Sequence, residues 1–177
     1  MLKLCGKNIY LSAIEREHCM ILWAENEYDF NLMTEPLNIG HSIVKSDLWF
    51  NEIQELQGNT HIRLGIFLND GTIIGDIALQ NINWQHRSCD VGAGIAKIEN
   101  RSKGYGGEAL KLLLEYGFNN LGLERISATT LEQNILSKKL LIKTGFVQEG
   151  VERKAFYFAG KRWDKLNYGM LREEYNK

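Results

Sequence analysis

The stretch NRSKGYGGEA combines three glycines with two cations directly before a helical pattern. The glycines are Gly104, Gly106 and Gly107, and the cations are Arg101 and Lys103. Glycine lets a backbone approach a ligand closely, and the free N–H groups at the start of a helix attract anions. The stretch therefore predicts an anion-binding turn, most often one that holds a phosphate.

Two well-known phosphate-binding motifs, the P-loop and the dinucleotide fingerprint, do not account for this turn. The P-loop pattern GxxxxGK[ST] does not occur in the chain. Gly104, Gly106 and Ala109 satisfy the dinucleotide pattern GxGxxG/A, and Glu124 follows about 20 residues later, where a ribose-binding acid belongs. A dinucleotide domain, however, carries this turn in the first of several parallel βαβ units, and here it lies in the second half of the chain. A nicotinamide-dependent oxidoreductase is therefore only an alternative.

The elements that must position the turn follow from hydrophobic periodicity. The pattern predicts strands at Asn8–Ile14, Thr60–Leu68, Thr72–Ile82, Ser88–Lys97, Arg125–Leu131, Phe146–Val151 and Lys161–Leu171, helices at Glu15–Tyr28, Ser46–Leu56, Gly107–Leu121 and Ile135–Thr144, an irregular segment at Phe30–Ser46, and a turn at Ala159-Gly160. Asp70-Gly71 between two β-rich runs is a strong hairpin signal. The order predicts an α+β fold with a mixed sheet rather than regular βαβ alternation.

Composition limits the class of protein. The 177 residues fit one domain over 1–177, and 44% hydrophobic with 24% charged residues is ordinary for a globular chain. A net charge of −1 gives no basic footprint for nucleic acid, and no apolar run is long enough to span a membrane. The cysteines and histidines show no metal-ligand spacing, so we expect no metal. The N-terminus lacks a signal-peptide pattern, which predicts a cytoplasmic protein.

Further motifs point to one family. RSKGYG fits the pattern [Q/R]xxGxG/A and resembles the acetyl-coenzyme A pyrophosphate loop of the GNAT superfamily of N-acetyltransferases. The longer stretches VGAGIAKIENRSKGYGGEA, EQNILSKKLLIKTGFVQEG and FAGKRWDKLNYGMLREEY resemble its RimJ/RimL-type branch. The resemblance covers the whole chain and is most specific from Gly92 onward.

The resemblance implies a fold and a co-substrate, acetyl-CoA. The GNAT fold is a mixed α/β sandwich whose twisted, mostly antiparallel sheet of about seven strands splays between its fourth and fifth strands, with about four helices. The pantetheine arm would pair with the backbone of the fourth strand, and the pyrophosphate would rest on the glycine turn. The cofactor-binding positions implied are Ile95, Ala96 and Lys97 on the strand, Arg101, Ser102, Lys103, Gly104, Tyr105, Gly106 and Gly107 in the turn, and Asn134 and Ser137 beyond the fifth strand. Asn134 could instead be only a helix N-cap.

The implied reaction is acetyl transfer to a primary amine. The amine must lose a proton, and the general-base candidates are Asp90 and Glu149, with solvent as an alternative. Glu149 could instead form a structural ion pair. Many relatives place a tyrosine eight residues into the helix after Asn134 to protonate the leaving thiolate, but this chain has Leu141 there. Ser137 is the expected substitute, although its hydroxyl could serve only in capping.

The acceptor is expected to enter opposite the cofactor, between the early helices and the final hairpin. Trp49, Phe156, Tyr157 and Phe158 are candidates to line that slot. The resemblance favours a protein N-terminus, and a small polyamine, an amino acid or an antibiotic stay open as acceptors. Because of Leu141, a non-catalytic acyl-CoA-binding or sensing module also stays open. We expect a monomer or a homodimer.

Overall fold

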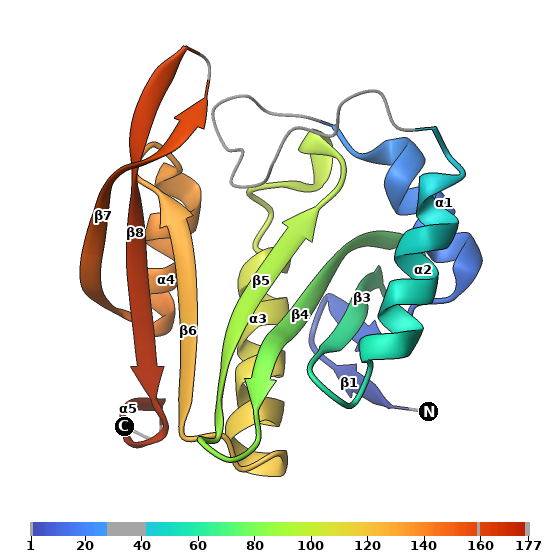
Figure 1. Cartoon of the computed structure of the whole chain (residues 1–177). Coiled ribbons are helices and arrows are strands. Elements are labelled where there is room, and N and C mark those ends of the chain that lie inside the picture. The colour runs from blue at the N-terminus through green and yellow to red at the C-terminus, as the bar shows by residue number, and fades with distance from the viewer. Residues whose placement is uncertain (1, 28–41, 159, 176–177) are drawn as a thin grey trace.

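The computed structural model describes residues 2–27, 42–158 and 160–175. Within these residues the chain forms an eight-stranded sheet in the order β1-β2-β3-β4-β5-β6-β8-β7 (Figure 1). The strands are β1 Lys3–Cys5, β2 Ile9–Ser12, β3 Ile62–Leu68, β4 Ile73–Asn83, β5 Ser88–Ile95, β6 Arg125–Leu131, β7 Val147–Phe158 and β8 Lys161–Leu171. The longer helices are α1 Arg16–Glu25, α2 Lys45–Leu56, α3 Tyr105–Glu115 and α4 Ile135–Thr144, and α5 Arg172–Tyr175 is a single turn. The predicted α+β class and GNAT-like sheet are confirmed, with β1 as a strand that the sequence did not indicate.

The boundaries differ from the predicted ones where local geometry intervenes. The third predicted helix begins earlier, at Tyr105, and its last predicted turn, Tyr116–Asn120, is a π-helix. The strand predicted at Phe146–Val151 is longer than expected and reaches Phe158, whereas the last strand has its predicted bounds. These two strands form a twisted hairpin that extends past the rest of the sheet (Figure 1). Most of the irregular segment predicted at Phe30–Ser46, and Ala159 of the last turn, lie outside the described residues.

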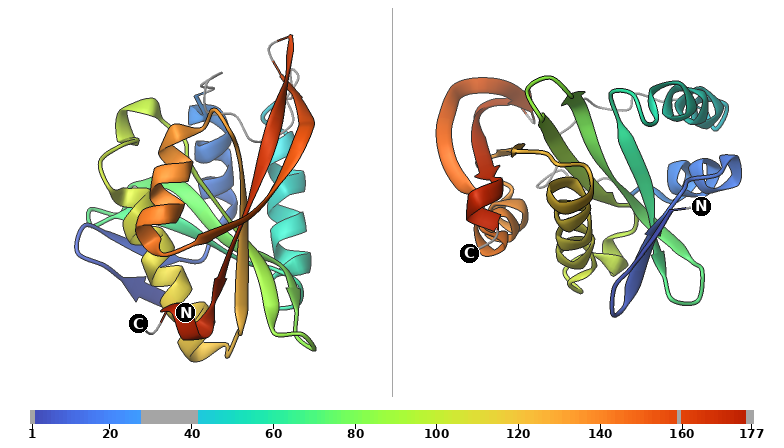
Figure 2. Two further views of the ribbon diagram at one scale, coloured as in Figure 1. Left: turned by 90° about the vertical axis from the view of Figure 1, so that its left-hand side faces the viewer. Right: turned by 90° about the horizontal axis from the view of Figure 1, so that it is seen from below.

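Helices cover both faces of the sheet (Figure 2). The main core lies between the sheet and α3, with α4 at its edge; its fully buried members include Ile77 of β4 and Leu113 of α3. On the other face, Leu22 of α1 packs with Phe67 of β3 and Ile73 of β4. β4 thus contributes buried side chains to both faces of the sheet, with Ile77 on the side of α3 and Ile73 on the side of α1. Both faces of the sheet are therefore buried against helices.

The sheet opens between β5 and β6. These two strands are parallel and pair only at Ser88–Asp90 with Arg125–Ser127, whereas all other neighbours pair antiparallel. Beyond that point β5 stays with β4 as far as Ile95, and β6 stays with β8 as far as Leu131. The facing edges of 91–95 and 128–131 therefore diverge, as Figure 1 shows, and we call the opening between them the wedge.

The hairpin predicted at Asp70-Gly71 is present. β3 and β4 pair antiparallel around it, and Gly71 has a φ of 93°, a conformation that glycine adopts without strain. Among the described residues, no helix combines the length and apolar character needed to cross a bilayer.

Candidate active site

The glycine turn presents a row of backbone amides at the start of α3. Gly104 is the N-cap with a φ of 91°, and Ser102 also has a positive φ of 61°. The first helical bond of this turn runs from the Glu108 amide to the Gly104 carbonyl, at 3.0 Å. Within the described residues, no acceptor is recorded for the N–H groups from Ser102 to Gly107. Six consecutive donors and the positive end of a helix dipole thus form an anion-binding cradle.

The three glycines of this cradle have different structural roles. A Cβ at Gly106 would meet no described atom within 4 Å, so the space over this residue is open. Gly104 has equally open surroundings but needs its positive φ. A Cβ at Gly107 would lie 3.2 Å from Leu140 Cδ1 of α4, so this glycine allows the two helices to pack closely. Gly106 is therefore the position where a ligand, rather than the protein, would meet an added side chain.

Arg101 is bonded within the fold. Its Nε donates to the Ile95 carbonyl at 3.0 Å, and its Nη2 donates to the Ala96 carbonyl at 2.9 Å and the Glu27 carbonyl at 2.6 Å. The guanidinium therefore ties the end of β5 to the end of α1. The Arg101 amide donates to the Ile98 carbonyl at 2.9 Å, so this residue is bonded within the fold through both its side chain and its amide, and the row of unbonded amides begins at Ser102. Lys103 is exposed and has no ion pair among the described residues, so its ammonium is the more available cation.

The edge of β5 offers main-chain groups to the wedge. Because the Ala96 amide donates to the Ile74 carbonyl of β4 at 2.9 Å, and antiparallel pairing alternates, Val91, Ala93 and Ile95 direct their backbone groups away from β4. The carbonyl of Ile95 already accepts from Arg101, so the amide of Ile95 is the backbone group that this residue offers to the wedge. Of the other positions implied by resemblance, Ala96 has both backbone groups bonded within the fold.

Lys97 pairs with Glu25 of α1 at 2.9 Å, and this bond, more than the neighbouring acids, raises its pKa. Its side chain thus holds the end of α1 beside the wedge.

The end of β6 contains polar atoms without partners. The Oγ1 of Thr130, which is 2% exposed, and the Oε1 of Gln133 are buried and have no hydrogen-bond partner among the described residues. A buried polar group left unpaired costs about 1–3 kcal/mol, so a ligand that reaches this end of β6 would relieve that cost. No sequence signal distinguishes Thr130 or Gln133 from other polar residues.

Asn134 and Ser137 lie together at the start of α4. The Oδ1 of Asn134 accepts from the Ser137 backbone amide at 2.9 Å, so the capping role is present. The capping bond involves the backbone amide of Ser137 and does not involve its hydroxyl. Leu141 is 5% exposed and belongs to the main core, so this position is filled by packing.

Of the two predicted bases, Asp90 lies at the closed end of the wedge, and Glu149 lies farther away, beside the start of β6. Asp90 is the last β5 residue that pairs with β6, and its carboxylate accepts from Asn81 Nδ2 at 2.9 Å. Glu149 forms two bonds to the Arg125 guanidinium, and this bonding lowers its pKa. Arg125 begins β6, about 20 Å from its far end at Leu131. Glu149 therefore has the surroundings of a structural ion pair.

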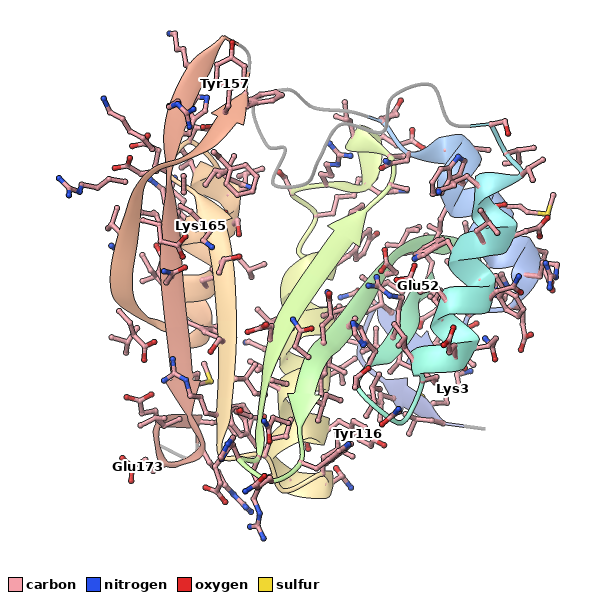
Figure 3. The ribbon with its side chains drawn as sticks, viewed as in Figure 1. Lys3, Glu52, Tyr116, Tyr157, Lys165 and Glu173 are labelled. Carbon is pink, nitrogen blue, oxygen red and sulfur yellow. The ribbon has the colours of Figure 1, made fainter. Side chains whose placement is uncertain are left out.

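The aromatic residues predicted at the acceptor slot are divided between two places. Trp49 lies on α2 beside β3, and Arg63 stands over its ring at 5.8 Å. Tyr157 is 70% exposed near the tip of the final hairpin (Figure 3). No group of three or more potential metal ligands occurs in the described part of the chain.

The wedge, the amide cradle and the order of the elements match the GNAT fold that the sequence resemblance implies. A family model described as "Acetyltransferase (GNAT) domain" matches residues 11–147, so the chain belongs to the GNAT acetyltransferase family.

Individual proteins resemble the chain over most of its length. It is 32% identical over 127 residues to the putative ribosomal N-acetyltransferase YdaF of Bacillus subtilis, covering 72% of this chain and 67% of that protein. It is 30% identical over 132 residues to a spermidine N(1)-acetyltransferase of Vibrio cholerae, covering 71% of this chain and 75% of that protein. A crystal structure of spermidine N-acetyltransferase from Vibrio cholerae in complex with CoA and spermine has a TM-score of 0.84 at 24% identity, covering 97% of this chain and 100% of that chain.

One further relative, the uncharacterized N-acetyltransferase YoaA of Bacillus subtilis, is 35% identical over 120 residues, which cover 67% of this chain. The matched stretch spans 66% of the length of YoaA.

Proposed function

We propose that this protein transfers the acetyl group of acetyl-CoA to a primary amine. The observation that carries the proposal is the joining of six unbonded amides at 102–107 to an open wedge between β5 and β6. The cradle would hold the pyrophosphate, and the backbone groups of Ala93 and Ile95 would pair with the pantetheine amides as an added strand does. The free Oγ1 of Thr130 lies on the opposite strand of the wedge.

The chemistry needs little from side chains. The neutral amine attacks the thioester carbonyl, a C–N bond forms, the C–S bond breaks, and the thiolate leaves with a proton. We assign thiolate assistance to the Ser137 hydroxyl, because the cap does not use it and Leu141 is packed in the core. Asp90 is the better-placed base of the two predicted, since Glu149 is held by Arg125. Solvent could also take the amine proton.

The acceptor has two candidates. Resemblance to a RimJ/RimL-type enzyme and to the putative ribosomal N-acetyltransferase supports a protein N-terminus. Similarity to a spermidine N(1)-acetyltransferase supports a small polyamine. The RimJ/RimL-type branch, the cytoplasmic location, the single-domain organisation and the monomeric or dimeric state stay predictions.

Binding and turnover test the proposal separately. Acetyl-CoA at about 100 times its dissociation constant should stabilise the protein by roughly 2.7 kcal/mol in a thermal-shift titration. Stabilisation by NAD alone would favour the oxidoreductase alternative. Release of free thiol with a panel of peptides and small amines would show catalysis, whereas acetyl-CoA binding without turnover of any amine would favour the sensing module.

A further inference from the structure

A cavity of about 100 Å³ lies between α2 and the strands β3 and β4, on the face of the sheet opposite α3. Its lining consists of Trp49, Glu52, Ile53, Leu56, Gln57, His61, Arg63 and Gln80. The cavity has room for a group of a few heavy atoms rather than for a whole acceptor. It is on the side of the sheet from which an acceptor would approach a donor bound beside α3.

The charges around this cavity leave one carboxylate uncompensated. Arg63 forms an ion pair with Asp76, and its guanidinium stands over the Trp49 ring. Burial and the neighbouring Arg63 lower the pKa of His61 from 6.5, so its imidazole is neutral at pH 7. Glu52 is exposed and has no ion-pair partner within the described residues. Figure 3 shows Glu52 on α2, beside β3 and β4. The cavity is thus suited to a cation.

The sheet register gives the distance from this cavity to the wedge. Arg63 of β3 pairs with Ala78 of β4, and Ala78 pairs in turn with Gly92 of β5. Neighbouring strands lie about 4.8 Å apart, so two strand spacings separate Arg63 from Gly92 by about 10 Å. Gln80, which lines the cavity, places its Nε2 2.8 Å from the point that a Cβ on Gly92 would occupy. The wall of the cavity therefore continues to the edge of the wedge.

We propose that this cavity is a subsite for a second cationic group of the acceptor, about 10 Å from the amine that is acetylated. The inference rests on the proposed function. Glu52 would pair with the cation, next to the Trp49 side chain in the same lining. The cation is an ammonium or guanidinium, which an extended diamine or the basic side chain of a short peptide could supply.

The test uses acceptors that differ only in the distal group. An eight-carbon α,ω-diamine spans on the order of 10 Å when extended, and the eight-carbon amino alcohol has a neutral group at the same position. In Glu52→Gln, the ratio of kcat/KM for the diamine to that for the amino alcohol should fall about tenfold, as expected for loss of one charged hydrogen bond. Glu55→Gln is the matched control, since Glu55 is on the same helix, exposed, and absent from the cavity lining.

Two tripeptide amides, with lysine or glutamine as the third residue, distinguish the sources of the cation. A selective loss for the diamine in Glu52→Gln supports a diamine acceptor, and a selective loss for the lysine peptide supports a basic peptide. Equal effects on charged and neutral acceptors would overturn the subsite while leaving the proposed function intact. If the parent protein turns over no amine, the proposed function fails. Calorimetry then decides the subsite: diamine binding that Glu52→Gln weakens supports it, and absent or unchanged binding overturns it.

Discussion

The substitution Gly106→Ala should have opposite effects on the stability of the free protein and on the binding of acetyl-CoA at the glycine turn. Gly106 is in the first turn of α3 with an ordinary helical φ, and an added Cβ meets no described atom within 4 Å. Replacement of glycine by alanine at such a site stabilises a protein by about 0.4–1 kcal/mol. For a chain of this length the melting temperature of the free protein should rise by about 1–4 °C.

The same methyl group should weaken acetyl-CoA binding, because it occupies the open space above the cradle. If affinity falls about a hundredfold, an acetyl-CoA concentration that gave 2.7 kcal/mol in the parent gives only about 0.4 kcal/mol. Differential scanning fluorimetry with and without acetyl-CoA measures both effects. A variant that is more stable when free and nearly insensitive to acetyl-CoA supports the cradle. A full acetyl-CoA shift in Gly106→Ala would show that the pyrophosphate is held elsewhere.

Two further alanine variants serve as controls. Gly104→Ala should also lose the acetyl-CoA shift, but its φ of 91° means that the free protein is destabilised by about 1–2 kcal/mol. Gly58 follows α2, has a φ of 78°, and also has open surroundings. Gly58→Ala should therefore show a similar loss of stability with a normal acetyl-CoA shift, which separates backbone strain from ligand contact.

Three other predictions concern side chains. Arg101→Lys should lower the free energy of unfolding by about 2 kcal/mol in urea titrations, because lysine cannot hold three carbonyls; Lys103→Gln should leave stability unchanged. Ser137→Ala should lower kcat by ~10²-fold or more at unchanged acetyl-CoA affinity, and full activity would remove its role. Glu149 has a pKa held below 4.5 by Arg125, so the stability it contributes is present above that pH and is lost as the pH falls; acid titration of Glu149→Gln should lack this loss.

Much of the fold could be predicted because it depends on local pattern. The β-rich runs of β3 and β4, the Asp70-Gly71 turn between them and the apolar face of α3 each appear in a few consecutive residues. β1 was missed because three residues with mixed exposure carry too little periodicity. The opening of the sheet between the strands Ser88–Ile95 and Arg125–Leu131 was expected from the family resemblance rather than from periodicity.

The candidate site could be predicted only in part. The backbone donors of the glycine turn are implied by glycines before a helix, and this part of the site depends on few distant contacts. Arg101 shows the limit of that reasoning. Its cationic side chain suggested a phosphate ligand, but three carbonyls from β5 and the end of α1 surround it in the folded chain. A side chain's partners depend on what folds against it, and sequence spacing does not report that.

The sequence by itself determined the class of element at each segment, the anion-binding turn and the family, because these are written in neighbouring residues and short motifs. The tertiary structure alone decided which backbone groups of β5 remain free and that Glu149 is held by Arg125. It alone brought Glu52 of α2 to the same cavity as Gln80 of β4, two strands from the wedge. These features join residues far apart in the chain, and their distances are set by strand register and helix packing, which no local pattern encodes.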